Sequence, residues 1–464
     1  MKPGATPESG FAGVWRVVGA KAAPWASKAS PSATRYPLLE YAIDFAAGEV
    51  KGPAPVACKG ATFSSGVSAA DELFAGQLHH SEAAAKALNL TGSSVTTYRV
   101  ICEGKPRDYY VDDNAALVTW QDDVVYTLER PTGMDPQQYT PGFSGPAFDC
   151  AKAKTAGEQM ICRDAALSKA DRKLNEAFSR LKATETPASF DTVRVAQRDW
   201  IAYVTKSCHA GGSMPDDVGD RDAMRGCLEE HFSDRAQRLA NAEVAKAGAL
   251  VLEPRMRLMT RKRPETEESD IYPWMSGGPA ATAFNAYVSA TLALDKRRMD
   301  DKDLFPFGED VADMKLSALR TYSVARFDAH VVSLQVSTFD YTGGAHEVLG
   351  ETSLNWDMAR AKPFALDDVF ARKKAWRAFV TDFCIKDLHD AFAEQGAPDP
   401  DRDAIESVVG DSDNWLWGAD SATVHFTVYA IASFSGGESD VEIPYSVLAP
   451  YLRPDAPVSS PAKP

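Results

Sequence analysis

The sequence predicts an α+β protein built from several domains. A chain of 464 residues is longer than one typical domain. Short strand-like runs dominate its first part, long helical stripes with four cysteines occupy its middle, and strands alternate with two helices toward its end. We expect a small mostly-β domain in residues 1–140, a disulfide-linked helical domain in 141–248, an α+β domain with an antiparallel sheet and two helices in 249–455, and a disordered tail in 456–464.

The N-terminal part is predicted to form a small sheet, because its apolar and β-branched residues come in short runs between turn residues. The runs cover residues 14–18, 39–45, 96–102, 109–111 and 124–128. His79 and His80 have no third ligand at a motif spacing, so a solvated pair is favoured over a metal site. We assign this domain no role of its own.

The helical segment begins at a capping box, in which the Thr155 and Glu158 side chains can satisfy free backbone N–H groups. The first helix should end near Cys162, Asp164 can cap the second, and Pro187 marks the break before the third. Apolar residues at helical spacing mark the buried faces of the later helices. They are Leu167, Ala170, Leu174, Phe178 and Leu181, then Val193, Trp200 and Val204, then Met224, Leu228, Phe232 and Leu239. Helix is predicted to continue through residues 242–249, before a strand that starts at Leu250.

Six of the seven cysteines form sequential pairs, as expected for structural disulfides in an oxidising compartment. Four cysteines in the helical segment allow three pairings, and sequence cannot choose among them. We favour short local loops, since closing roughly fifteen residues is worth about 3 kcal/mol. On this ground the favoured pairs in the helical segment are Cys150 with Cys162 and Cys208 with Cys227, while Cys58 with Cys102 is the sequential pair that could link the N-terminal sheet. Cys384 remains, and a buried inert thiol is favoured over a reactive one.

The order of motifs in this segment resembles the LprI-type lysozyme-inhibitor family. The motifs are Asp149-Cys150, Ile161-Cys162, Arg194-x-x-Gln197-Arg198-x-Trp200, a cysteine, and Cys227-Leu228 before Phe232 and Arg235. The resemblance covers about a fifth of the chain and implies recognition of a lysozyme. We favour core packing for Trp200, with Gln197 bonded to a neighbouring backbone group, over a contact role for either residue.

The net charge of the chain indicates which classes of partner are favoured. A formal net charge of −15 makes nucleic acid and anionic membranes unfavourable partners and favours a basic protein, such as a common lysozyme. The basic run 255–263 is followed by acidic residues at 265–270, and we expect a solvated hairpin or loop there. The sequence holds no apolar run long enough to span a membrane. Its first residues do not look like a secretory signal, so export implies a signal already removed, and a cytoplasmic protein with reduced thiols is the alternative.

The C-terminal part resembles the domain shared by the anti-sigma factor RsiV and the deacetylase PdaC. The residues that carry the resemblance are Tyr341-Thr342-Gly343-Gly344-Ala345-His346, Asn355-x-Asp357, Leu366-Asp367-Asp368-x-Phe370 and Ile443-Pro444-Tyr445. The resemblance covers nearly half of the chain and implies lysozyme binding, because the RsiV domain binds lysozyme. Residues 428–434 depart from the family pattern, so the contact loop is expected to differ. The binding residues we predict are Tyr341, Thr342, Gly343, Gly344, His346, Tyr429 and Phe434.

Catalysis is the less favoured interpretation of the 341–346 turn. The two glycines can supply positive φ angles for a tight connection, with His346 orienting the turn rather than acting as a base. The sequence contains no metalloprotease, Walker or nucleophile-elbow motif, and nothing resembles the deacetylase domain of PdaC. We therefore predict a periplasmic or secreted non-enzymatic protein without cofactor or metal, which recognises and inhibits a lysozyme or related cell-wall hydrolase. Candidate contact loops are 341–346, 433–439 and 216–222. An envelope module that binds peptidoglycan or a partner protein is the alternative.

Overall fold

The computed structural model describes most of the chain. The described residues are 4–26, 38–78, 82–121, 123–131, 144–262, 265–299, 315–343, 346–372, 375–394, 401–431 and 437–458. The chain divides into two compact units, residues 1–177 with 204–237 and residues 178–203 with 238–464. The domain boundaries predicted from the sequence stay predictions, and the His79-His80 pair lies outside the described residues.

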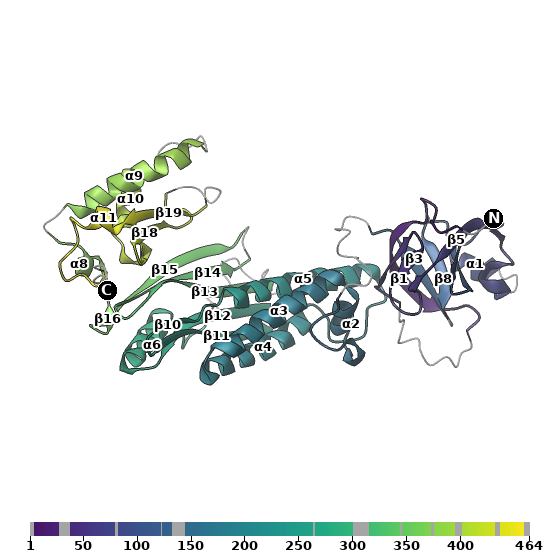
Figure 1. The fold of residues 1–464 in the computed structure, drawn as a ribbon, viewed down its shortest axis with the longest axis horizontal. Coiled ribbons are helices and arrows are strands. Elements are labelled where there is room, and N and C mark those ends of the chain that lie inside the picture. The colour runs from purple at the N-terminus through teal and green to yellow at the C-terminus, as the bar shows by residue number, and fades with distance from the viewer. Residues whose placement is uncertain are drawn as a thin grey trace. The chain divides into compact units, whose positions relative to one another are not determined.

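The first unit contains a nine-stranded antiparallel sheet in the order β4-β3-β2-β1-β9-β8-β7-β6-β5. Four of these strands, β1, β3, β5 and β8, are labelled in Figure 1. Its strands are β1 Gly13–Ala22, β2 Ala42–Ala46, β3 Glu49–Lys51, β4 Cys58–Lys59, β5 Thr62–Ala69, β6 Ser94–Cys102, β7 Lys105–Val111, β8 Leu117–Gln121 and β9 Val124–Glu129. One face buries aromatic rings, among which Phe11 stacks on Phe45 with centroids 4.1 Å apart. The predicted mostly-β N-terminal part is confirmed. A short 3-10 helix, Leu73–Gly76, and α1, Glu82–Lys86, lie in the connection between β5 and β6.

Four helices follow the sheet along the chain, namely α2 Ala156–Arg163, α3 Ala165–Thr184, α4 Pro187–Ser207 and α5 Val218–Asn241. Both halves of the predicted capping box are present at Thr155 and Glu158, and Asp164 accepts a hydrogen bond from the Leu167 N–H at 3.0 Å. The predicted continuation of helix through 242–249 is wrong. Helix α5 ends at Asn241, and Ala245–Ala247 form strand β10, whose backbone pairs with the next strand instead of a helical turn.

Three disulfides join the favoured pairs: Cys58 with Cys102, Cys150 with Cys162, and Cys208 with Cys227. Gly157 shows why the start of α2 tolerates no larger residue. Its N–H donates to the Ala210 carbonyl at 2.9 Å, and a Cβ on Gly157 would come within 2.7 Å of the Ala210 side chain. Cys384 is buried, and burial raises the pKa of its thiol to about 12, as expected for an inert residue.

The second unit holds a seven-stranded sheet in the order β10-β11-β12-β13-β14-β15-β16. The strands after β10 are β11 Leu250–Lys262, β12 Glu265–Ser276, β13 Lys315–Phe327, β14 Val331–Tyr341, β15 Val348–Asp357 and β16 Lys362–Pro363. All pairs are antiparallel except β12 with β13, which is parallel because helix α6, Pro279–Thr291, connects the two strands. The aromatic rings of Phe284 and Tyr287 on α6 pack against Trp356 of β15.

The charged run predicted to be solvated is instead part of this sheet. It does form a hairpin, β11 with β12, but Glu268 and Asp270 are buried. Asp270 accepts two hydrogen bonds from Arg257, at 3.1 and 2.5 Å, and forms an ion pair with Arg320 at 3.6 Å. The expectation was wrong because β12 lies between β11 and β13 and is buried on both faces along residues 266–271, where arginines from the two neighbouring strands pair with the Asp270 carboxylate.

A three-stranded antiparallel sheet completes the second unit, with strands β17 Trp415–Trp417, β18 Ser421–Phe426 and β19 Ser439–Pro444. Helices α9, Trp376–Glu394, and α10, Arg402–Val409, lie against this sheet (Figure 1). The predicted second helix is α9, whereas α10 was not predicted because its eight residues give a short signal. Short helices α8, Leu366–Val369, and α11, Tyr445–Leu448, flank the sheet along the chain. The predicted α+β fold class is confirmed.

Candidate functional site

Two hairpins of the second unit bring together most of the binding residues predicted from the sequence. Tyr341 is the last residue of β14 and packs against a small buried cluster. Thr342, Gly343 and His346 lie in the β14–β15 connection, and Tyr429 follows β18. Gly343 adopts a φ of +94°, which fits the positive φ expected of a tight connection. Gly344 and Phe434 lie outside the described residues.

His346 and Tyr429 are in direct contact, although 82 residues separate them along the chain. The Tyr429 hydroxyl lies 3.2 Å from His346 Nε2, and His346 Nδ1 lies 2.8 Å from the Glu347 carbonyl. Tyr429 has a φ of +68°, a left-handed conformation that a bulky residue rarely adopts. Such strain is common at functional sites, where surrounding structure maintains it.

Apolar side chains are exposed around this contact. Among the described residues, five large apolar side chains are exposed, and three of them belong to these hairpins: Phe339 at 42%, Val348 at 61% and Tyr429 at 61%. Val348 pairs with Asp340, and directly paired residues point to the same face of a hairpin. Because successive residues of a strand point to opposite faces, Phe339 projects from the face opposite to Val348. We call Phe339, His346, Val348 and Tyr429 the hairpin tip.

Acidic side chains accompany the hairpin tip. Glu347 is adjacent to it in sequence and exposed, Glu438 is exposed in the β18–β19 connection, and Asp440 has 62% of its side chain exposed at the start of β19. Exposed aromatic and aliphatic groups beside carboxylates suit a partner with a basic surface.

A buried histidine connects the seven-stranded sheet with the three-stranded sheet of the second unit. His425 of β18 forms ion pairs with Glu351 of β15 and with Asp440 of β19, the latter at 2.6 Å from Nδ1. Glu351 also accepts a hydrogen bond from Ser337 at 2.9 Å and another from Gln335. Burial lowers the pKa of His425, but the bonds and charges of its two carboxylates outweigh burial and raise it to about 10. His425 is therefore cationic at neutral pH.

Further polar contacts fix the two sheets against each other. Asn355 accepts a hydrogen bond from Ser333 and donates one to the Trp415 carbonyl, both at 2.8 Å. The Ser333 hydroxyl in turn accepts a hydrogen bond from the backbone N–H of Trp417 at 2.8 Å. The Asn-x-Asp motif therefore has a structural role, since Asp357 caps the turn after β15 through the Ala359 and Arg360 N–H groups.

In the helical segment, Trp200 and Gln197 are buried, as favoured for core residues. Only residues 216 and 217 of the predicted 216–222 loop precede helix α5, which begins at Val218. Asp216, Asp217 and Asp220 are exposed, but Asp222 pairs with Arg16 and Arg225. Ile201 of α4 is 52% exposed and presents an apolar contact point outside the hairpin tip.

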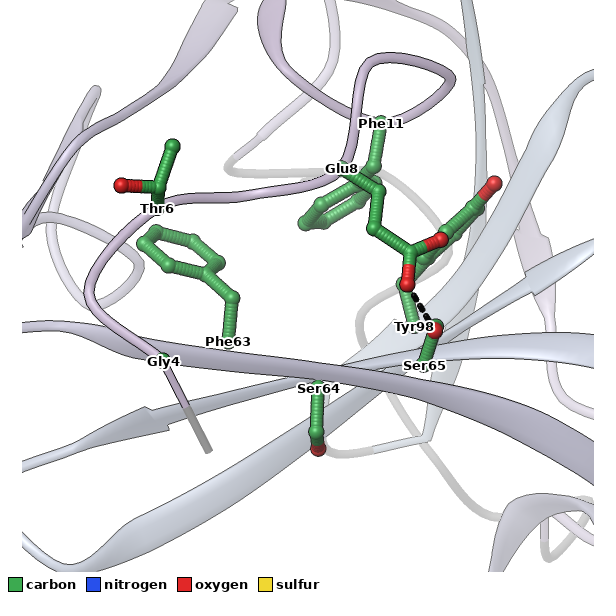
Figure 2. A pocket seen from close by; sticks show the side chains of 8 residues that line it. All are labelled: Gly4, Thr6, Glu8, Phe11, Phe63, Ser64, Ser65 and Tyr98. Carbon is green, nitrogen blue, oxygen red and sulfur yellow. Dashed lines mark hydrogen bonds between the residues drawn. The ribbon is translucent and has the colours of Figure 1, made fainter. Parts of the chain in front are cut away.

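The first unit has a pocket of about 200 Å³, shown in Figure 2. It is lined by Gly4, Thr6, Glu8, Phe11, Phe63, Ser64, Ser65 and Tyr98. The rings of Phe11 and Tyr98 stack with centroids 4.6 Å apart, and the Glu8 carboxylate accepts a hydrogen bond from Ser65 (Figure 2). Sequence reasoning missed this pocket, because its lining comes from the N-terminal segment and two strands that no motif connects.

Sequence reasoning also missed the His425 cluster. The only available signal was the alternation Val424-His425-Phe426, which places a histidine between two core residues of a strand. Nothing in the sequence shows that Glu351, a residue of another sheet, contacts His425.

Comparisons with known proteins match two segments of the chain. Residues 150–239 match the family model of the lysozyme inhibitor LprI, and residues 367–446 match that of a protein of unknown function, DUF3298. The second match agrees with the resemblance to RsiV and PdaC. Lipoprotein LprI of Mycobacterium bovis and of Mycobacterium tuberculosis is 28% identical over 117 residues, which are 25% of this chain and 52% of each relative. The chain thus spans about half the length of the curated relatives it matches.

Two solved structures of DUF3298 family proteins also match. The protein from Bacteroides fragilis is 17% identical, with 47% of this chain and 98% of that chain covered and a TM-score of 0.33. The protein from Pseudomonas aeruginosa is 16% identical, with 48% and 99% covered and a TM-score of 0.34. In the part of the chain that the structure describes, no helix has both the length and the apolar character needed to cross a membrane.

Proposed function

We propose that this protein is an exported, non-enzymatic binding protein that recognises and inhibits a lysozyme or a related cell-wall hydrolase. The observation that carries the proposal is the match of residues 150–239 to a lysozyme-inhibitor family, in a segment held by two disulfides. Disulfides fit an extracytoplasmic location, where such hydrolases act.

The hairpin tip is the contact surface that we assign to this function. Three exposed apolar side chains there offer the kind of anchors that supply most of the affinity at protein interfaces. Charge supports the same surface. In residues 401–455, Asp and Glu outnumber Lys and Arg by ten to two, whereas residues 150–239 hold fourteen acidic and fifteen basic residues. Steering of a basic enzyme therefore comes from the C-terminal part of the chain and not from the helical segment.

The test is inhibition of a basic lysozyme by the whole chain in a cell-wall turbidity assay, with binding measured in parallel. Tyr429→Ser should weaken binding by roughly thirtyfold, the equivalent of a ~2 kcal/mol contact. Val67→Ser is the matched control, because Val67 is 70% exposed on β5, outside the hairpin tip. Ile201→Ser tests the helical segment as the contact surface instead.

Several results would count against the proposal. Absence of both binding and inhibition at micromolar protein and low salt would contradict it and favour the envelope-binding alternative. Binding that Ile201→Ser weakens and Tyr429→Ser does not would move the contact surface to the helices. An association rate unchanged by 0.5 M salt, far above the ionic strength at which exposed charges are screened, would exclude electrostatic steering.

A further inference from the structure

The cluster around His425 has the composition of a metal site. One ligand atom from each of Glu351, His425 and Glu438 lies within 4.8 Å of the other two. A nitrogen and two carboxylate oxygens at this spacing form a ligand set that divalent transition metals accept. The residues come from β15, β18 and the β18–β19 connection, so the topology and not a sequence motif assembles them.

The histidine is oriented as a metal ligand would be. Asp440 lies 2.6 Å from His425 Nδ1, which holds that nitrogen protonated and turns Nε2 toward Glu351. His425 is only 5% exposed, and its Nε2 forms an ion pair with the Glu351 carboxylate. A carboxylate on the far nitrogen is the usual support of a metal-bound histidine, because it fixes the tautomer and the ring orientation.

The charge of the cluster also favours a cation. Three carboxylates, those of Glu351, Glu438 and Asp440, surround one imidazole, so negative charge is in excess even when His425 is protonated. A divalent ion would relieve the repulsion between the carboxylates.

We propose that Glu351, His425 and Glu438 bind a divalent metal ion, with Zn²⁺ preferred over Mn²⁺ by the general affinity order for mixed nitrogen and oxygen sites. Asp440 acts as a positioning residue through His425. Gln335 and Ser337, which hydrogen-bond Glu351, hold the first carboxylate in place. The bound ion replaces the proton on Nε2 and links β15 to the β18–β19 connection, independently of whether the protein binds a lysozyme.

The test is equilibrium dialysis of the untagged whole chain against Zn²⁺, with bound metal determined by elemental analysis. Glu438→Gln is the decisive variant, because Glu438 is exposed and its substitution leaves the core intact. We expect it to lose one equivalent of zinc or to bind that equivalent at least tenfold more weakly. Glu442→Gln, on the same strand as Asp440 but outside the cluster, should bind zinc as the wild type does. Asp440→Asn should weaken zinc binding about tenfold, the lower end of the range for such supporting groups.

Thermal unfolding gives a second readout. Zinc should raise the unfolding midpoint of the wild type and of Glu442→Gln, but that of Glu438→Gln by clearly less. Equal zinc binding and equal midpoint shifts in wild type and Glu438→Gln would overturn the proposal, since the other histidines would then account for the metal. Absence of any zinc binding by the wild type at 100 µM free metal would overturn it as well.

Discussion

Glu40 lies at the centre of a buried ion-pair cluster, and its loss should destabilise the first unit strongly. Its buried carboxylate forms ion pairs with three arginines: Arg16 of β1 at 2.6 Å, and Arg221 and Arg225 of α5. Each guanidinium is nearly as buried as the carboxylate. Because α5 belongs largely to the segment that matches the lysozyme inhibitors, this carboxylate fastens that segment to the N-terminal strands within one unit.

Glu40→Gln keeps the shape of the side chain and removes its charge, which leaves three buried guanidinium groups around a neutral amide. Removing one partner of a buried ion pair costs about 3–5 kcal/mol, and we expect a loss in the free energy of unfolding in this range. Asp164 and Asp222 also pair with Arg225, so they limit the loss to the lower part of the range.

Urea unfolding followed by circular dichroism measures the effect of Glu40→Gln. The control is Glu129→Gln, an exposed carboxylate on β9, which should change the free energy of unfolding by less than about 0.5 kcal/mol. A Glu40→Gln variant as stable as the control would refute the role assigned to the buried cluster.

Three further variants test other parts of the structure. Burial and a neighbouring carboxylate raise the pKa of Glu185 from 4.5 to about 8, so the folded chain keeps a proton that the unfolded chain releases and stability falls as pH rises between these values. Glu185→Gln should therefore stabilise the protein by about 1–2 kcal/mol at pH 8, after allowance for solvent screening, and should have no effect at pH 4. Thermal unfolding at the two pH values measures this difference, and the exposed control Glu176→Gln should leave the melting curve unchanged at both. Replacing Cys208 and Cys227 together by Ala should cost about 3 kcal/mol in urea unfolding, because their disulfide closes a loop with a sequence separation of 19; no change would mean that the loop is ordered without it. Asp270→Asn should lower the unfolding midpoint through a loss of about 3–5 kcal/mol, and an unchanged midpoint would show that its arginines find other partners.

Local signals in the sequence predicted the helical segment well. The capping box at Thr155 and Glu158 and the Asp164 cap depend on residues three positions apart, so the sequence contains the whole interaction. The end of α5 was misplaced, because Ala-rich residues after Asn241 favour helix while pairing with β11 makes residues 245–247 a strand.

Long-range interactions account for what sequence reasoning missed. Asp270 looked solvated because its arginine partners come from β11 and β13, and only the sheet shows that they share a face. For the same reason His425 stayed unnoticed beside Glu351. The contact of His346 with Tyr429 was predicted only in part. Both residues were predicted as binding residues, but their contact depends on how two hairpins lie in the fold.

Hydrogen–deuterium exchange of the whole chain, with and without a basic lysozyme, tests the central claim most directly. We expect slower exchange on complex formation in peptides that cover residues 339–350 and 427–440, where the hairpin tip lies, and no change in peptides that cover β5. Binding without protection in these peptides, or protection confined to residues 150–239, would contradict the assignment of the hairpin tip as the contact surface.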